Sequence, residues 1–375
     1  MSVEEILAEL VGIKSVSSNS NVEIIKHLAR RTESLGLHVH LLPYMDESQV
    51  EKVNMIAVAG TDSADIEVEL ALVGHTDTVP YAPAWAEALK LTERDRKLYG
   101  RGACDTKGFI AAALAAVERM DLKRLARPLA LVFTADEEVG CLGAKRLADA
   151  RVLSARYTIV GEPTSLQPMR AGKGYCLAEI TMRGREGHSA YPALGASAIF
   201  RAARLVTRIE RIAEELKSDV RAAFEPPYTT LNVGLINGGT AKNIIAGECR
   251  FTLEWRPVPG QSSEHLVNLI RACIEDERSR DEDFDCSLNV IRLDEGMETR
   301  ADSRLVRMLE EACGREAGTI AFGTEAPQMI ELGAEAVVLG PGNIRAAHRT
   351  DEFVPVEELH ECVLILSRAI EHFCM

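Results

Sequence analysis

Two histidines and several carboxylates follow apolar, strand-like runs of this sequence or stand just before an Ala-rich segment. The runs are LALVG, LALVFTA, YTIVG and AVVLGPG, and the stretch before the Ala-rich segment is GRGACDTKGF. The side chains in question are His75, Asp77, Asp105, Asp136, Glu137, Glu138, Glu162 and His348. In an open α/β sheet, functional groups gather beyond the carboxyl ends of the strands. We therefore expect these groups to converge where the strands that carry them are neighbours.

Imidazoles and carboxylates without thiolates are ligands that suit Zn²⁺, Co²⁺ or Mn²⁺. Without cations, so many buried carboxylates would repel one another, and desolvation would raise their pKa values. Two divalent cations about 3.5–4 Å apart remove this conflict and can acidify a bridging water and polarise a substrate carbonyl. Because adjacent residues of an extended chain point in opposite directions, one of Glu137 and Glu138 can bind a cation while the other acts as a general base.

Each of these residues also has an ordinary structural interpretation. A single histidine such as His75 at a strand end is more often a surface or capping residue, and an acidic run such as DEE is usually a solvated turn. Asp105 could cap a helix that begins near Lys107, and Glu162 before Pro163 could belong to a loop. The joint pattern, with several ligand-type groups in one α/β region, favours a metal-dependent hydrolase.

The segments that must position these groups alternate between helical and strand-like patterns. VEEILAELVGI and NVEIIKHLARRTESLGL space apolar residues as helices do, GFIAAALAAVERM is Ala-rich, and NMIAVAG, VELALVG, LALVFTA and YTIVGEP are strand-like. This alternation predicts an α/β fold with a mixed, largely parallel sheet flanked by helices. Since 375 residues exceed the usual limit of one hydrophobic core, we expect two domains.

A different pattern begins near Tyr175 and ends near Gly296. Its β-α-β-β-α-β order is typical of the ferredoxin-like motif, and the charged run EDERSRDED within it is expected to be a solvated loop. The expected elements are strand 176–183, helix 195–217, strands 229–236 and 248–256, helix 262–275 and strand 284–291. The α/β pattern then resumes with helix 303–313, strand 334–339 and helix 356–373. We therefore predict a domain at 175–292 inserted into a catalytic domain formed by 1–174 and 293–375.

Composition limits the classes of binding partner and the cell compartment that we expect for this protein. A formal net charge of −14 argues against a nucleic-acid partner, because phosphates require a basic surface. The acidic start MSVEEILAELVGI does not have the pattern of a secretory signal, and no apolar run is long enough to span a bilayer. Nine cysteines without a CxxC pair indicate reduced thiols. These observations predict a cytoplasmic protein.

At these residues the chain resembles the M20 family of metallopeptidases and deacylases. The matching stretches run in family order over nearly the whole chain: GHTDTVP, LYGRGACDTKGF, FTADEEVG, GEPT, GREGHSA, NGGTAKN, EWRPVPG and AHRTDEFV. The resemblance implies a zinc aminopeptidase-like catalytic domain and a ferredoxin-like lid domain through which two copies form a homodimer. It also implies two divalent metal ions as cofactors, Zn²⁺ first and Co²⁺ as the alternative.

The resemblance also assigns roles to individual residues. It implies that His75 and Glu162 bind one metal, that Glu138 and His348 bind the other, and that Asp105 bridges them. Two further carboxylates complete the implied site: Glu137 is the general base, and Asp77 orients His75 through the second ring nitrogen.

Three lid residues match family positions that reach the substrate. His188 in GHSA resembles the histidine that polarises the scissile carbonyl, often from the partner subunit, and Asn243 and Arg256 match contacts to the substrate carboxylate. Taken alone, His188 would be read as a turn histidine and Arg256 as a surface arginine. EWRPVPG carries Glu254 where the family usually has aspartate.

The C-terminal stretch FGTEAPQMIELGAEAVVLGPGNIRAAHRTDEFV resembles the deacetylase branch of the family. It implies a small N-acyl amino acid as the substrate and the conversion of N2-acetyl-L-ornithine to L-ornithine and acetate, a step of arginine biosynthesis. Glu325 would then favour a cationic side chain on the substrate. Deacetylation of acetylcitrulline, desuccinylation, aminoacylase and dipeptidase activity are the hydrolytic alternatives. A ligand-binding protein without turnover and a metal-free scaffold are the alternatives outside this class.

Overall fold

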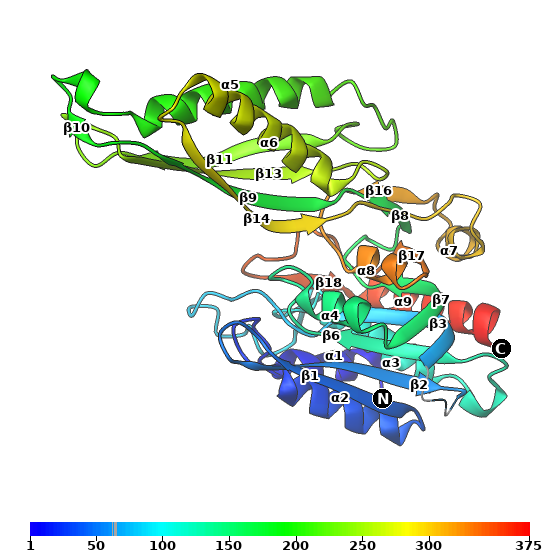
Figure 1. Ribbon diagram of the computed structural model, residues 1–375. Helices are drawn as coiled ribbons and strands as arrows, with labels where there is room; N and C mark the ends of the chain where they lie inside the picture. Colours follow the sequence, from blue (N-terminus) through cyan, green and yellow to red (C-terminus); the bar gives the residue numbers. More distant parts are fainter. Residues whose placement is uncertain (62, 64–65) are drawn as a thin grey trace. The chain divides into compact units, whose positions relative to one another are not determined.

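The computed structural model describes residues 1–61, 63 and 66–375, and the chain divides into two compact units (Figure 1). The first unit comprises Met1–Arg170, Thr299–Gly318 and Thr324–Met375. The second comprises Ala171–Glu298 and Thr319–Gly323. No helix of the described residues is long and apolar enough to cross a membrane.

A mixed sheet has the strand order β1-β2-β6-β3-β7-β17-β8-β15, and the first six strands of this order form the centre of the first unit. The four central strands, β6, β3, β7 and β17, are parallel to one another, and the strands on both sides of them are antiparallel. The strands span His38–Met45 (β1), Glu51–Ala59 (β2), Ile66–His75 (β3), Leu129–Thr134 (β6), Leu153–Val160 (β7), Met169–Gly172 (β8), Met297–Glu298 (β15) and Glu335–Val338 (β17). β16 (Gly318–Ile320) pairs with β8. The predicted fold class is confirmed.

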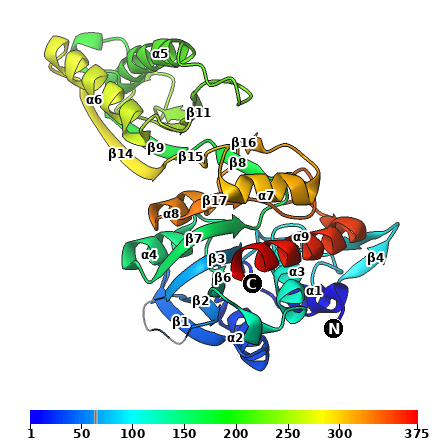
Figure 2. The ribbon, with the colours of Figure 1, turned by 90° about the vertical axis from the view of Figure 1, so that its right-hand side faces the viewer.

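Helices cover both faces of this sheet, and Figure 2 shows α3 and α9 on one side and α4 and α8 on the other. The helices of this unit are α1 (Val3–Gly12), α2 (Val22–Ser34), α3 (Lys107–Glu118), α4 (Leu142–Ala150), α7 (Arg304–Cys313), α8 (Ala326–Glu331) and α9 (Val356–Cys374). α3 is buried on almost every side, since its alanines allow close contact with both the sheet and α9. A small sheet, β18-β5-β4, joins Phe353–Pro355, Lys97–Tyr99 and Thr92–Arg94.

The second unit is a four-stranded antiparallel sheet with two helices. Its strand order is β11-β13-β9-β14, and its chain order is β9-α5-β11-β13-α6-β14, which is the ferredoxin-like arrangement. The elements span Tyr175–Arg183 (β9), Ala198–Leu216 (α5), Thr230–Gly238 (β11), Glu248–Arg256 (β13), Ser263–Arg280 (α6) and Asp285–Asp294 (β14). A two-residue ribbon, β10 (Gly187–His188) with β12 (Ile244–Ile245), extends from this sheet.

The expectation that EDERSRDED forms a loop is wrong for most of its length. α6 continues through this run to Arg280. The helix persists because its acidic side chains pair with arginines of α5: Arg208 contacts both Asp276 and Glu277, and Arg204 also contacts Glu277. Composition alone could not reveal these partners, which lie about seventy residues away in the chain.

Candidate metal centre

Three of the predicted ligand segments emerge side by side from the sheet. β6, β3 and β7 are adjacent and parallel, with His75 opposite Thr134 and Val73 opposite Val160. The carboxyl ends of these strands therefore lie at one edge. His75 is the last residue of β3, while Glu137 and Glu162 follow β6 and β7 within three residues of the strand ends.

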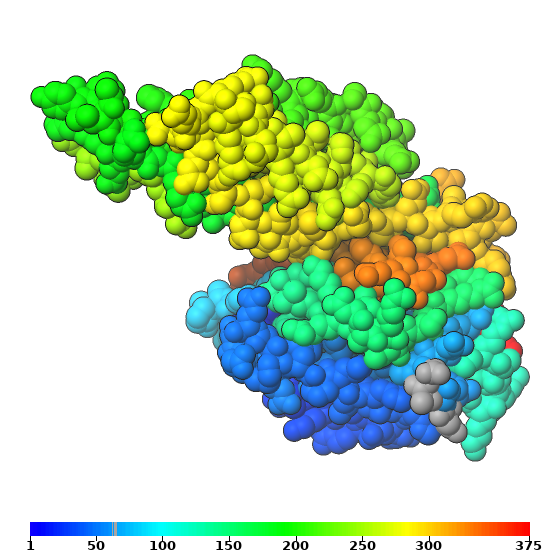
Figure 3. Space-filling view, in the orientation of Figure 1, coloured from blue at the N-terminus to red at the C-terminus, as the bar shows by residue number. Residues whose placement is uncertain are grey.

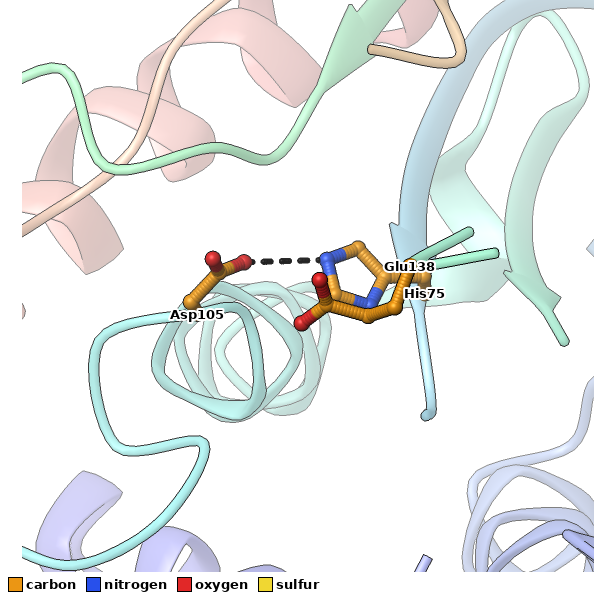
Figure 4. A group of neighbouring side chains, drawn as sticks. All are labelled: His75, Asp105 and Glu138. Atoms are coloured by element: carbon orange, nitrogen blue, oxygen red, sulfur yellow. Dashed lines mark hydrogen bonds and ion pairs between the residues drawn. The ribbon is translucent and has the colours of Figure 1, made fainter. Parts of the chain in front are cut away.

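Asp105, in the loop before α3, lies between two imidazoles. One carboxylate oxygen, Oδ1, is 3.0 Å from His75 Nε2 (Figure 4), and the other, Oδ2, is 3.1 Å from His348 Nε2. The same His348 nitrogen is 3.0 Å from Glu138 Oε2. The two oxygens of one carboxylate thus face two different imidazoles.

Two overlapping sets of side chains have ligand atoms that all lie within 4.8 Å of one another. One set is His75, Asp105 and Glu138, and the other is His75, Glu137 and Glu162. His75, Asp105 and Glu162 are almost fully buried. The structure therefore brings the predicted ligands of both metals together, and it also places the predicted base within ligand distance.

Burial creates an electrostatic conflict among these carboxylates. It raises the pKa of Glu137 to about 8, helped by the charges of Glu138 and Asp105 and opposed by His75. The pKa of Glu162 is likewise raised well above its ordinary value by burial and by neighbouring carboxylates. Asp105 differs, because hydrogen bonds with His348 and His75 outweigh its burial and hold its pKa below the usual range.

Divalent cations fit this arrangement. Glu138 Oε1 is buried and has no hydrogen-bond partner among the described residues, so the carboxylate has an oxygen available for a ligand. The donor atoms are imidazole nitrogens and carboxylate oxygens, the set that suits Zn²⁺ or Co²⁺. Positive charge at this point would also relieve the repulsion that raises the pKa values of Glu137 and Glu162.

The sequence from residue 71 to 372 matches the profile of Peptidase family M20/M25/M40. The chain belongs to this family. It is 54% identical over 370 residues to a Myxococcus xanthus protein named acetylornithine deacetylase, and the match covers 98% of this chain and 96% of the relative. A Klebsiella pneumoniae protein of the same name is 36% identical over 382 residues, covering 99% and 97% of the two chains.

Solved structures of low sequence identity share the fold. A Staphylococcus aureus tripeptidase superposes with a TM-score of 0.79 at 23% identity, covering 99% of this chain and 97% of its own. An M20 family metallo-carboxypeptidase from Sulfolobus solfataricus gives 0.76 at 18% identity, with 100% and 99% coverage. The predicted membership of the M20 family is confirmed, and with it the expectation of an amide hydrolase with a metal centre.

In this M20 chain, Asp77 supports more than the His75 ring. His75 Nδ1 is 3.0 Å from the backbone carbonyl oxygen of Asp77 and 3.6 Å from its carboxylate. The carboxylate accepts hydrogen bonds from the N–H groups of Glu137 and Glu138, at 3.1 and 3.3 Å, and from the Ser17 hydroxyl at 2.7 Å. Asp77 therefore fixes the turn that carries both glutamates, and Ser17 is a contributor that sequence patterns did not single out.

Asp136, the residue before the two glutamates, is held by hydrogen bonds from side chains of β1 and β2. Asp136 has a positive φ of 58°, a left-handed conformation that turns the chain sharply after β6. Its carboxylate accepts hydrogen bonds from the buried Lys52 ammonium, at 2.6 Å, and from the Tyr44 hydroxyl, at 2.9 Å. A lysine at the start of the apolar run of β2 was the available sequence signal for this support.

Two of the predicted substrate residues, His188 and Asn243, lie at the β10–β12 ribbon of the second unit. His188 is exposed, its Nδ1 accepts a hydrogen bond from the N–H of Ala190, and it pairs across the β10–β12 ribbon with Ile244. Asn243 lies beside it, because its carbonyl accepts the N–H of the residue after His188. The ribbon therefore brings together two residues that are far apart in the sequence.

Arg256 is held by three contacts within the second unit. Its Nε donates to Glu254 at 2.8 Å, its Nη1 donates to the Ala321 carbonyl at 2.9 Å, and its guanidinium lies 4.5 Å from the centre of the Tyr175 ring. Glu254, which stands where the family usually has aspartate, thus pairs with Arg256 on the same face of β13, as residues two apart on a strand can.

Glu325, predicted to contact the substrate, is only 1% exposed. Burial raises its pKa to about 7, against the lowering influence of His75 and of the Thr134 hydroxyl. Its carboxylate therefore belongs to the buried surroundings of the metal centre in this conformation, and its predicted contact with substrate stays a prediction.

The raised carboxyl pKa values predict a pH-dependent stability of the metal-free protein. Between the ordinary glutamate value of about 4.3 and the native values of about 8 for Glu137 and about 7 for Glu325, the native state binds more protons than the unfolded state. The stability that these two protonated carboxyl groups contribute is therefore complete below the ordinary glutamate value and is lost as pH rises through the native values, so the melting temperature of chelator-treated protein should fall from pH 5 to pH 7. Lys107, whose pKa burial lowers to about 7, acts in the opposite sense only above that pH.

Calorimetry at pH 5, 6 and 7 measures this slope. Glu137→Gln removes one titrating group and should flatten it, and saturating Zn²⁺ should abolish most of it. A melting temperature of the chelated protein that rises over this window would contradict the electrostatic account.

Proposed function

We propose that this chain removes the acetyl group from N2-acetyl-L-ornithine, giving L-ornithine and acetate. The observation that carries the proposal is the pair of ligand sets that share His75, with Asp105 in one and Glu137 in the other, in a chain more than half identical to a protein named acetylornithine deacetylase. The family supplies the reaction class, and the relatives' name supplies the substrate.

The proposed cofactors are two divalent cations, with Zn²⁺ favoured by the nitrogen and oxygen donors. His75 and Glu162 would hold one, Glu138 and His348 the other, and Asp105 would bridge them. When bound, such ions would polarise the acyl carbonyl and lower the pKa of a water molecule toward neutral pH.

Glu137 is the proposed general base. Its backbone is fixed by Asp77, and Oε1 lies 3.4 Å from the Cys141 thiol, so its carboxylate position is constrained from two sides. A carboxylate in a site that raises its pKa can accept the proton of the attacking water and return it to the departing amine.

The residues of the second unit have chemistry that suits substrate binding. Because His188 Nδ1 accepts a hydrogen bond from Ala190, the proton of its neutral ring lies on Nε2, which can then donate to the acyl oxygen as negative charge develops. The guanidinium of Arg256, with the amide of Asn243, is proposed to bind the substrate's α-carboxylate.

The adjacent glutamates provide a matched test of this function. Glu137→Gln should retain two metal ions and lose about a hundredfold to ten-thousandfold in kcat on N-acetylornithine, whereas Glu138→Gln should lose metal. Metal analysis together with acetate release from N-acetylornithine, N-acetylcitrulline, N-succinyl-diaminopimelate and dipeptides measures both points.

Faster turnover of any other substrate in this panel would replace the proposed substrate. Metal loss in Glu137→Gln instead of Glu138→Gln would exchange the roles of the two residues. Metal binding without turnover of any substrate would leave a ligand-binding protein.

Glu325 is proposed to select a cationic substrate side chain, which would require its carboxylate to become accessible. Glu325→Gln should raise KM for N-acetylornithine about tenfold or more, because a charge-assisted hydrogen bond is lost, and should raise KM for N-acetylmethionine less. Steady-state kinetics on both substrates checks the difference. Equal increases would place the effect on the metal centre and remove the selectivity role.

We also propose that the second unit forms a homodimer. β11 is an edge strand, and large apolar side chains are exposed on it and near the start of α5. They are Tyr191, Leu194, Phe200, Leu235 and Ile236, each more than half exposed. The stretch that holds the first three is green in Figure 3 and forms one end of the surface of this unit. Exposed apolar clusters of this kind mark protein interfaces, and the matching chemistry is a second copy of the same edge.

Introducing charge into this surface should dissociate the dimer. Leu235→Lys, at a side chain that is 65% exposed, should give a monomer in sedimentation experiments. The control is Leu364→Lys on α9 of the first unit, where the side chain is 50% exposed, and this variant should remain a dimer. Wild-type protein that sediments as a monomer would refute the proposal.

The remaining partner and compartment assignments are proposals of the same kind. The net charge of −14 favours small-molecule substrates over nucleic acid. All nine cysteines are free thiols, which supports a reducing compartment such as the cytoplasm.

A further inference from the structure

A buried ion pair outside the predicted site joins two distant parts of the first unit. Arg101 precedes Asp105 by four residues, and Glu352 follows His348 by four. Arg101 Nη1 lies 2.5 Å from Glu352 Oε2, and the two side chains are 3% and 0% exposed. Neither residue carries a role in the chemistry described above.

Glu352 holds the backbone of the residue proposed to bridge the metals. Its Oε1 accepts hydrogen bonds from the N–H of Asp105 at 3.0 Å and from the N–H of Cys104 at 2.9 Å. Its own carbonyl accepts the N–H of Gly100 at 3.1 Å. The loop that carries Asp105 is therefore fastened at both ends to this single residue.

Arg101 extends the connection to two further ligand segments, those of His75 and His348. Its Nη2 donates to the carbonyl of Pro80 at 3.3 Å and to the carbonyl of Arg349 at 3.4 Å. Pro80 closes the GHTDTVP segment that contains His75, and Arg349 is the residue after His348. The planar guanidinium therefore links the segments of three ligands with donors in a fixed geometry.

This linkage matters because Asp105 has little freedom. Each of its carboxylate oxygens faces a different imidazole at about 3 Å, so a rotation of its backbone would improve one contact only by losing the other. His348 itself is half exposed, at 51%, and has a left-handed backbone, so burial does little to hold it in place. Contacts behind the ligands must supply the rigidity.

We propose that Arg101 and Glu352 are positioning residues of the metal centre, which hold Asp105 between His75 and His348. A buried ion pair is poor evidence for stability in general, since apolar residues of similar volume often replace it without loss. What this pair contributes is fixed geometry, because its two side chains form hydrogen bonds with several backbone groups at fixed angles. The inference rests on the proposed metal centre and does not depend on which acyl-amino acid is the substrate.

The test compares this pair with another ion pair of the same unit. Arg31 Nη2 and Glu118 Oε1 are also 2.5 Å apart, with side chains 12% and 21% exposed, and they join α2 to α3. Glu352→Gln and the control Glu118→Gln each remove one carboxylate charge. Affinity for Zn²⁺ is measured by competition with a chromophoric chelator, and the Co²⁺ absorption spectrum reports ligand geometry.

Glu352→Gln should weaken Zn²⁺ binding about tenfold to a hundredfold, alter the Co²⁺ spectrum and lower kcat, with little change in KM. Glu118→Gln should lower the melting temperature at most and leave metal affinity and spectrum unchanged. Since Glu352→Gln can fail to fold, the double variant Arg101→Met, Glu352→Met provides a second measurement, with retained folding and the same loss of metal affinity expected.

Wild-type metal affinity and spectrum in either folded variant would overturn the positioning role. A wild-type protein that binds no Zn²⁺ would instead overturn the metal centre itself, so the two failures are distinguishable. An equal loss of affinity in Glu118→Gln would show that metal binding follows general stability, and this result would also overturn the inference.

Discussion

One carboxylate oxygen of Asp105 contacts His75 and the other contacts His348, and the rest of the site is arranged around these two contacts. A carboxylate shared in this way must be held at a fixed angle, and the groups around it must tolerate its charge. Burial makes both requirements stringent, because a low dielectric strengthens attraction and repulsion alike. The pKa values of Glu137 and Glu162 are raised because burial and the repulsion between neighbouring carboxylates are not fully compensated within the protein. Two cations would compensate them.

Parallel strands hold the ligand segments at fixed positions around this carboxylate. Because β6, β3 and β7 run in the same direction, the segments that follow them emerge at one edge, and side chains separated by about ninety residues become neighbours. Polar groups behind the ligands then restrain these segments. Asp77 receives the N–H groups of both glutamates, Lys52 and Tyr44 hold Asp136, and the Arg101–Glu352 pair restrains the loop of Asp105.

The second unit carries the residues that are proposed to bind the substrate. Its antiparallel sheet has a core of its own, and the short β10–β12 ribbon carries His188 and Asn243 away from that core. Arg256, by contrast, is fixed on β13 by Glu254, Ala321 and Tyr175. A division into one unit for the ligands and another for substrate groups fits the proposed hydrolysis of a small N-acyl amino acid.

The sequence by itself determined the fold class and predicted a ferredoxin-like insertion and a set of ligand-type residues, since hydrophobic periodicity and residue chemistry are local properties. It also indicated that His75 and Glu162 follow strands, but not that these strands are neighbours. Only the tertiary structure decided the contacts made across long separations. Ser17 on Asp77, Glu352 behind Asp105 and the arginines of α5 that keep residues 275–280 helical are of this kind. The physical reason is that a buried polar group is stabilised by its partner, and nothing in its own segment specifies which distant residue that partner is.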